Sequence, residues 1–182
     1  IAVGGGLYEE AVVFLAGGRK GLSIKGGYDP SDWSWAPAAH PTIVRPASAA
    51  QDVVSIHTPS NSLIGLTLTG GQRGVYAKFG AGLNNGILAL DQCIVSNNAS
   101  HGFFHDNGSS WNGVTIRNGL IVGNGGDGVK VDQDWTTPFY NFIVNTTIAN
   151  NGGSGYLGGN YYQRSTYIVN CIIAFNGEYG IR

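Results

Sequence analysis

A set of acidic and aromatic residues in the second half of the chain has the composition of a site that binds or cleaves sugars. Its members are Asp106, Trp111, Lys130, Asp132, Asp134, Trp135 and Tyr161. Glycoside hydrolysis uses two carboxylates, one as the acid and the other as the nucleophile or base. Aromatic rings cover the apolar face of a pyranose and commonly line sugar-binding surfaces. This chemistry requires a fold that brings residues from distant parts of the sequence onto one face.

An internal repeat supplies such a fold. Four asparagines stand 26, 27 and 25 residues apart, and they are Asn98, Asn124, Asn151 and Asn176. A glycine stands four residues after each of them. Aliphatic residues stand three and eight residues before each, and a residue with a side-chain amide stands six residues before each. Short β-branched stretches favour strands, whereas Asn and Gly tolerate the left-handed backbone of sharp corners. The repeat predicts an all-β, single-stranded, right-handed parallel β-helix of about seven coils with roughly 26 residues each.

The repeated asparagines have a structural explanation. Stacked coils place equivalent residues one strand spacing apart, about 4.8 Å, so these side chains can form a hydrogen-bonded amide ladder. Cys93 and Cys171 share one column three coils apart, which separates them by about 14 Å. Because a disulfide needs Cα atoms within about 7 Å, we expect both thiols to be free.

The repeat also predicts which candidate site residues share a face. The strand from 128 to 132 alternates, so Val129 and Val131 should point inward while Lys130 and Asp132 point outward. One coil earlier, Asp106 takes the position of Asp132. Asp134 follows nominally on the same side, and beyond it runs a loose aromatic column of Trp111, Trp135 and then Tyr161 or Tyr162. The alternative is that these are ordinary solvent-facing polar residues beside rings that pack over a loop.

The first half of the chain has a different pattern. It contains Gly6-Leu7-Tyr8-Glu9-Glu10, the segment from Gly21 to Asp29 with Trp33, Pro41-Thr42-Ile43-Val44, and the segment from Ile64 to Gly71. These phrases resemble the opening coils of secreted or cell-surface bacterial right-handed parallel β-helix proteins of the pectate-lyase-like superfold. The resemblance implies one β-helix domain over residues 1–182, with opening coils in 1–80 and regular coils in 81–182, and the domain is expected to be part of a longer chain. It also implies an extracellular or cell-surface location.

Several functions are disfavoured by the composition and motifs. A net charge of −1 shows no basic stripe for nucleic acid, and no apolar run is long enough to span a membrane. Ser100-His101-Gly102 is similar to a polygalacturonase motif, but the other motifs of that family do not occur, so His101 is expected to be a corner residue. Asp106 and Asp132 could offer oxygens to Ca²⁺, yet two carboxylates fall short of six to eight ligands. No cofactor or metal is predicted, and catalytic residues stay unassigned.

The function expected from these observations is a non-catalytic extracellular structural or adhesive module, such as a component of a surface, stalk, sheath or filament. Unpaired terminal coils are sheet edges, which favours a homo-oligomer or end-to-end assembly as the partner. The alternatives are a carbohydrate-binding module, with a glycan as ligand, and a polysaccharide lyase or glycoside hydrolase on the outward Asp and aromatic face.

Overall fold

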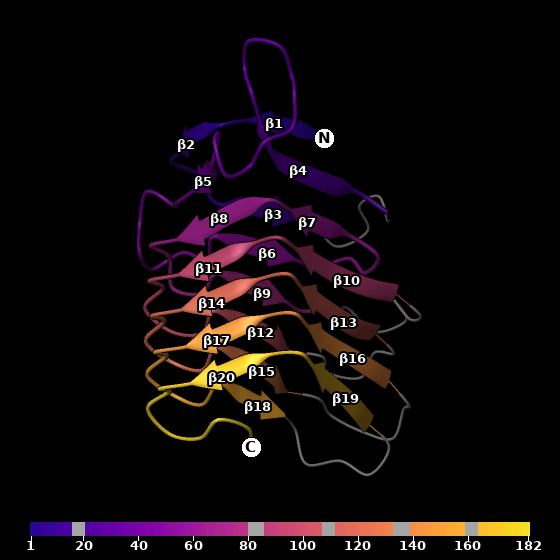
Figure 1. Ribbon diagram of the computed structural model, residues 1–182, viewed down its shortest axis with the longest axis vertical. Helices are drawn as coiled ribbons and strands as arrows, with labels where there is room; N and C mark the ends of the chain where they lie inside the picture. Colours follow the sequence, from indigo (N-terminus) through magenta and orange to yellow (C-terminus); the bar gives the residue numbers. More distant parts are fainter. Residues whose placement is uncertain (16–20, 80–85, 107–111, 133–138, 159–163) are drawn as a thin grey trace.

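The computed structural model covers residues 1–182 and describes all of them except 16–20, 80–85, 107–111, 133–138 and 159–163. The described residues form strands and turns with no helix, and the strands wind into a stack of coils (Figure 1). Three parallel sheets run along the stack, which confirms the predicted parallel β-helix. The described strands make six complete coils and the first two strands of a seventh, compared with the seven coils expected.

Each coil contributes one strand to each sheet, and we name the sheets A, B and C. Sheet A contains β1 (Ala2–Gly4), β4 (Ser23–Tyr28), β7 (Ser62–Ile64), β10 (Gly86–Asp91), β13 (Asn112–Arg117), β16 (Phe139–Val144) and β19 (Arg164–Val169). Sheet B contains β2 (Gly6–Tyr8), β5 (Thr42–Val44), β8 (Leu66–Thr69), β11 (Ile94–Ser96), β14 (Leu120–Val122), β17 (Thr147–Ala149) and β20 (Ile172–Ala174). Sheet C contains β3 (Val12–Phe14), β6 (Val54–Ile56), β9 (Val75–Ala77), β12 (Phe103–Asp106), β15 (Val129–Asp132) and β18 (Tyr156–Gly158).

The core is a column of aliphatic side chains inside the stack. Leu63, Leu90, Ile116 and Ile143 are in register on successive strands of sheet A, and all four are buried. Alternation along each strand sends every second side chain inward, so one short apolar stretch per coil is enough to fill the interior. The aliphatic positions of the repeat are therefore core positions.

The predicted asparagine ladder is present. Nδ2 of each asparagine donates to Oδ1 of the next one, at 2.9 Å for Asn98 to Asn124, 2.9 Å for Asn124 to Asn151 and 3.0 Å for Asn151 to Asn176. The first rung caps the preceding coil, because the backbone N–H of Gly71 donates to Oδ1 of Asn98 at 3.0 Å. The first three asparagines are buried, and each hydrogen bond joins two successive coils.

The left-handed corners lie beside this ladder. The repeated amide six residues before each ladder asparagine has a positive φ, between 50° and 54°, in Gln92, Asn118, Asn145 and Asn170. The residue directly before each ladder asparagine is also left-handed, and even Phe175 adopts φ 56° there. The ladder asparagines are absent from the positive-φ residues, so hydrogen bonding explains them better than backbone conformation does.

The repeated glycine is required by close approach. At Gly128 an added Cβ would lie 2.4 Å from Ile148 Cγ2 and 2.8 Å from Asn151 Nδ2. Gly102 and Gly155 have the same surroundings one coil away on either side. A side chain at this column would therefore displace both the core and the ladder. Cys93 and Cys171 are free, as expected from their spacing.

Candidate functional site

The outer face of sheet C brings together the described members of the predicted site. Phe104 is in register with Lys130, and Asp106 is in register with Asp132, as the repeat predicted. Val129 and Val131 are buried, whereas Lys130 is half-buried and Asp132 is exposed. Asp134, Trp111, Trp135 and Tyr161 lie outside the residues that the structure describes. Asp106 and Asp132 are therefore neighbours on this face, whereas Asp134 and the aromatic column stay predictions.

Asp106 is bound by the coil before it. Its Oδ2 accepts hydrogen bonds from the Tyr76 hydroxyl at 2.9 Å and from Lys78 Nζ at 2.8 Å. Desolvation, followed by the hydrogen bond to Asp106, raises the pKa of Tyr76 above its ordinary value. The same carboxylate raises the pKa of Lys78, which is an exposed cation. Asp106 thus binds Tyr76 on β9 and Lys78, the residue directly after β9.

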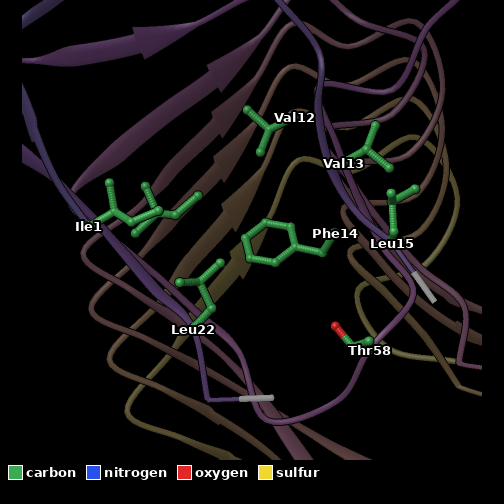
Figure 2. Close-up of a pocket in the computed structure, with 8 residues that line it drawn as sticks. Ile1, Val12, Val13, Phe14, Leu15, Leu22 and Thr58 are labelled. Atoms are coloured by element: carbon green, nitrogen blue, oxygen red, sulfur yellow. The ribbon is translucent and has the colours of Figure 1, made fainter. Parts of the chain in front are cut away.

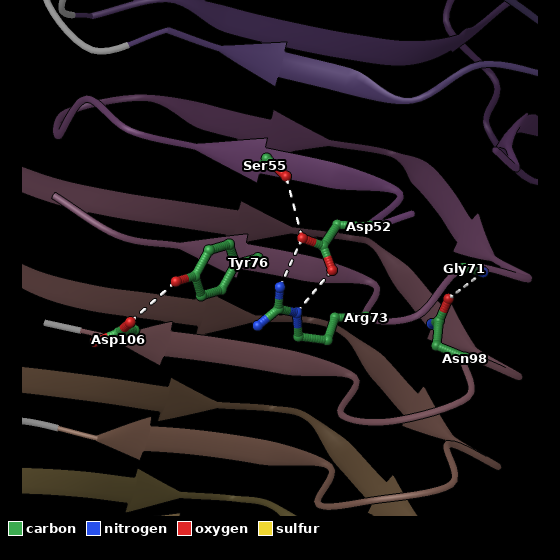
Figure 3. Close-up of polar contacts among 7 residues, drawn as sticks. All are labelled: Asp52, Ser55, Gly71, Arg73, Tyr76, Asn98 and Asp106. Carbon is green, nitrogen blue, oxygen red and sulfur yellow. Dashed lines mark hydrogen bonds and ion pairs between the residues drawn. The ribbon is translucent and has the colours of Figure 1, made fainter. Parts of the chain in front are cut away.

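A second charged pair joins the two coils that precede the coil of Asp106 along the chain. Arg73 donates to both carboxylate oxygens of Asp52, through Nε at 2.7 Å and an Nη at 2.9 Å, and Ser55 donates to the same carboxylate (Figure 3). The Arg73 guanidinium lies 3.7 Å from the centroid of the Tyr76 ring, so it covers one face of that ring. A bidentate pair of this kind fixes both side chains in one geometry.

Rings and cations continue this stack along sheet C. The Tyr76 and Phe104 rings lie 5.7 Å apart and tilted, and Lys130 Nζ lies 5.0 Å from the Phe104 centroid. The outward column of sheet C therefore runs from Arg73 over two rings to Lys130. These rings are partly covered by side chains of the protein itself, which reduces the flat area left for a sugar ring.

Sequence reasoning missed the upper half of this face. Tyr76 is in register with Phe104, and Lys78 follows at the level of Asp106. The signal was present, because Gly74-Val75 occupies the columns of Gly102-Phe103 one coil earlier. The repeat is marked by its asparagine, and that coil has Gly71 at the ladder position instead.

The corner between sheets B and C contains His101 and Asp127. The backbone N–H of Asp127 donates to Nδ1 of His101 at 3.0 Å, and Asp127 Oδ1 accepts from the N–H of Ser154 at 2.7 Å. Burial lowers the pKa of His101, although the Asp127 carboxylate opposes that shift. These contacts join three successive coils and confirm that His101 is a corner residue.

The outer face of sheet A carries an exposed aromatic cluster near the C-terminal end. Phe142 and Tyr167 stack with ring centroids 5.2 Å apart, and Tyr140 lies 6.0 Å from Tyr167. Rings that stack face to face along the coil axis present mainly their edges to solvent. The stacked Phe142 and Tyr167 rings therefore cover each other's faces, whereas the Tyr140 ring is tilted against both.

Two of the hollows in the described structure bear on ligand binding. The first has a volume of about 340 Å³ and lies at the N-terminal end of the interior, where Phe14 points inward between Ile1, Val12 and Leu22 (Figure 2). Its lining is almost entirely apolar and continues the core. The second has a volume of about 520 Å³ and lies on the outer face of sheet B, beside the segment 37–41 that precedes β5.

The charged groups of sheet C form pairs rather than a metal-binding cluster. Within the described residues there is no group of three or more His, Cys, Asp or Glu side chains placed to hold a metal ion. Asp52 and Asp106 each have a cationic partner, and Asp132 is exposed at the end of β15. These side chains can hold successive coils together and can offer hydrogen bonds to a ligand.

No protein-family model matches the sequence, and none of the curated proteins is significantly similar to it. No helix in the described part of the chain is long and apolar enough to cross a membrane.

Proposed function

We propose that the chain is a non-catalytic structural or adhesive module of an extracellular surface, such as part of a stalk, sheath or filament. The observation that carries this proposal is that the described charged pairs of sheet C join successive coils. Arg73 and Asp52 lie on neighbouring coils, as do Lys78 and Asp106. In an enzyme, polar side chains of this kind would point toward the substrate. In this chain they connect one coil to the next.

The hydrogen-bonded columns support the same function. The buried asparagine ladder and the exposed Asn118–Asn145–Asn170 ladder, with hydrogen bonds of 3.3 and 2.7 Å, both run along the axis of the stack. A solenoid depends on contacts between neighbouring coils, so bonds along its axis resist the separation of coils. The resemblance of the first half to secreted bacterial β-helix proteins favours an extracellular location.

The location is tested by labelling intact and permeabilised cells of the source organism with antibodies against the chain. Labelling of intact cells, or of filaments seen by electron microscopy, is the expected result. Labelling that appears only after permeabilisation would contradict the proposal. Sedimentation of the purified chain over a range of concentrations separates a self-assembling component from a monomeric module.

A second candidate is a carbohydrate-binding surface on sheet C, and an enzyme on that face is the third. The observation that favours binding is the register of Asp106 with Asp132, which repeats a carboxylate on two successive coils beside Phe104 and Lys130. A glycan array with the wild-type chain and with the double variant Lys130→Ala/Asp132→Ala tests this candidate. Binding to a glycan that is lost in the double variant supports the sheet C surface.

A further inference from the structure

The groove on the outer face of sheet B has a regular floor. Thr67, Ile94, Leu120 and Thr147 are in register on four successive strands, and all four line the groove. Neighbouring strands lie about 4.8 Å apart, so hydroxyl groups at the two ends of this column flank two apolar side chains. Pro37 and Pro41 line the same groove from the segment between β4 and β5.

The corner between sheets A and B supplies amide groups to the groove. Gln92 and Asn118 line it from successive coils, and their left-handed backbones (φ 53° and 54°) place them at the turn. The side-chain amide of Gln92 and the hydroxyls of Thr67 and Thr147 form no hydrogen bond with other described residues. The groove therefore presents donors and acceptors that the described protein groups leave unused.

The groove is uncharged in the part that the structure describes. Its described lining contains no Asp, Glu, Lys, Arg or His. The neighbouring charged residues, Asp91 and Arg117, pair with each other at 2.8 Å on sheet A. A charged ligand would find no opposite charge in this lining, so electrostatics does not favour an anionic or a cationic chain.

We propose that this groove binds an uncharged linear polysaccharide. The Gln92 amide and the two threonine hydroxyls bond sugar hydroxyls, and the apolar C–H face of a sugar residue lies over Ile94 and Leu120. A peptide fits less well, because the lining comes from a sheet face whose backbone groups are paired within sheet B, which prevents strand addition. The inference goes beyond the proposed structural function and does not depend on it.

The first test uses affinity electrophoresis in gels that contain a soluble polysaccharide. Dextran, galactomannan and xyloglucan serve as neutral probes, and alginate and polygalacturonate serve as acidic probes. We expect at least one neutral polysaccharide to retard the chain and neither acidic polysaccharide to do so. Retardation by an acidic polysaccharide alone, or by none of the five, would overturn the inference.

Two pairs of variants locate the binding. Leu120→Arg fills the groove, and its control Ile172→Arg makes the same change in the same outward column, outside the groove. We expect at least about thirtyfold weaker binding for Leu120→Arg, corresponding to a lost apolar contact and a buried charge, and wild-type binding for the control. Equal binding by the two variants would place the glycan elsewhere and contradict the inference.

The second pair keeps shape and removes hydrogen bonds. Thr67→Val/Thr147→Val deletes both hydroxyls of the floor, and Thr69→Val/Thr115→Val deletes two hydroxyls outside the groove lining. About tenfold weaker binding is expected for the first double variant alone, since a net hydrogen bond contributes modestly. Lys130→Ala/Asp132→Ala should bind like wild type, and loss of binding in that variant would assign the glycan to sheet C. Binding of an extended peptide library in place of every neutral polysaccharide would also overturn the inference.

Discussion

The side-chain amide of Asn124 donates a hydrogen bond to Asn151 one coil later, at 2.9 Å between Nδ2 and Oδ1. The same side chain accepts from Asn98 one coil earlier. A single buried residue therefore satisfies polar groups on both neighbouring coils. The stability of the stack depends on such columns as well as on its apolar interior.

Replacing Asn124 with Ala should destabilise the fold strongly. The change leaves the buried backbone N–H of Asn98 without its acceptor and removes the side-chain rungs to Asn98 and Asn151, which costs about 2–4 kcal/mol of unfolding free energy. Asn176→Ala is the matched control, because Asn176 ends the described ladder and is only half-buried. Urea unfolding should show a much smaller loss for Asn176→Ala, and equal losses would refute the importance of the interior rungs.

Gly128→Ala should be among the most damaging single-methyl additions in the chain. The new Cβ would lie 2.4 Å from Ile148 Cγ2, so the core and the ladder must both shift, at a cost of about 1–3 kcal/mol or more. At Gly180 in the same column, the nearest atom to an added Cβ is 3.8 Å away. Thermal unfolding should therefore separate the two variants, and a tolerated Gly128→Ala would disprove the close-approach explanation.

Phe175→Gly should stabilise the protein despite losing a large side chain. Phe175 has a left-handed backbone with φ 56° and is 85% exposed, so its ring contributes little packing. Relief of the backbone strain is expected to contribute about 0.5–1 kcal/mol. Phe175→Ala removes the ring but keeps the strained backbone, and it should give no gain. If both variants unfold at the same denaturant concentration, the strain is absent.

Burial of Cys93 should make stability depend on alkaline pH. Burial raises the pKa of its thiol from 9.0 to about 11, so the unfolded chain ionises before the folded one. The stabilisation that the neutral thiol gives to the folded state is fully present below pH 9 and is lost as the pH rises to about 11. We expect the wild type to lose about 2 kcal/mol more than Cys93→Ala across this range. Identical pH dependence of the wild type and Cys93→Ala would contradict the prediction.

The sequence predicted the features that recur with the coil period. The asparagine ladder, the glycine column and the register of Asp106 with Asp132 all follow from one alignment. Contacts between different columns do not recur in this way, so the hydrogen bond from Tyr76 to Asp106 and the pair of Arg73 with Asp52 were not predicted. The groove on sheet B was also missed, because it depends on how the segment 37–41 lies against the stack.

The proposed structural function is tested most directly by stretching a single molecule from its two ends. A stack joined coil by coil should resist force and then lengthen in steps of one coil, about 26 residues or roughly 90 Å of chain. Asn124→Ala should lower the force of the steps that separate the coils on either side of this rung. Smooth extension without steps, at the force of an unstructured polymer, would contradict the proposal that the chain is a mechanical module.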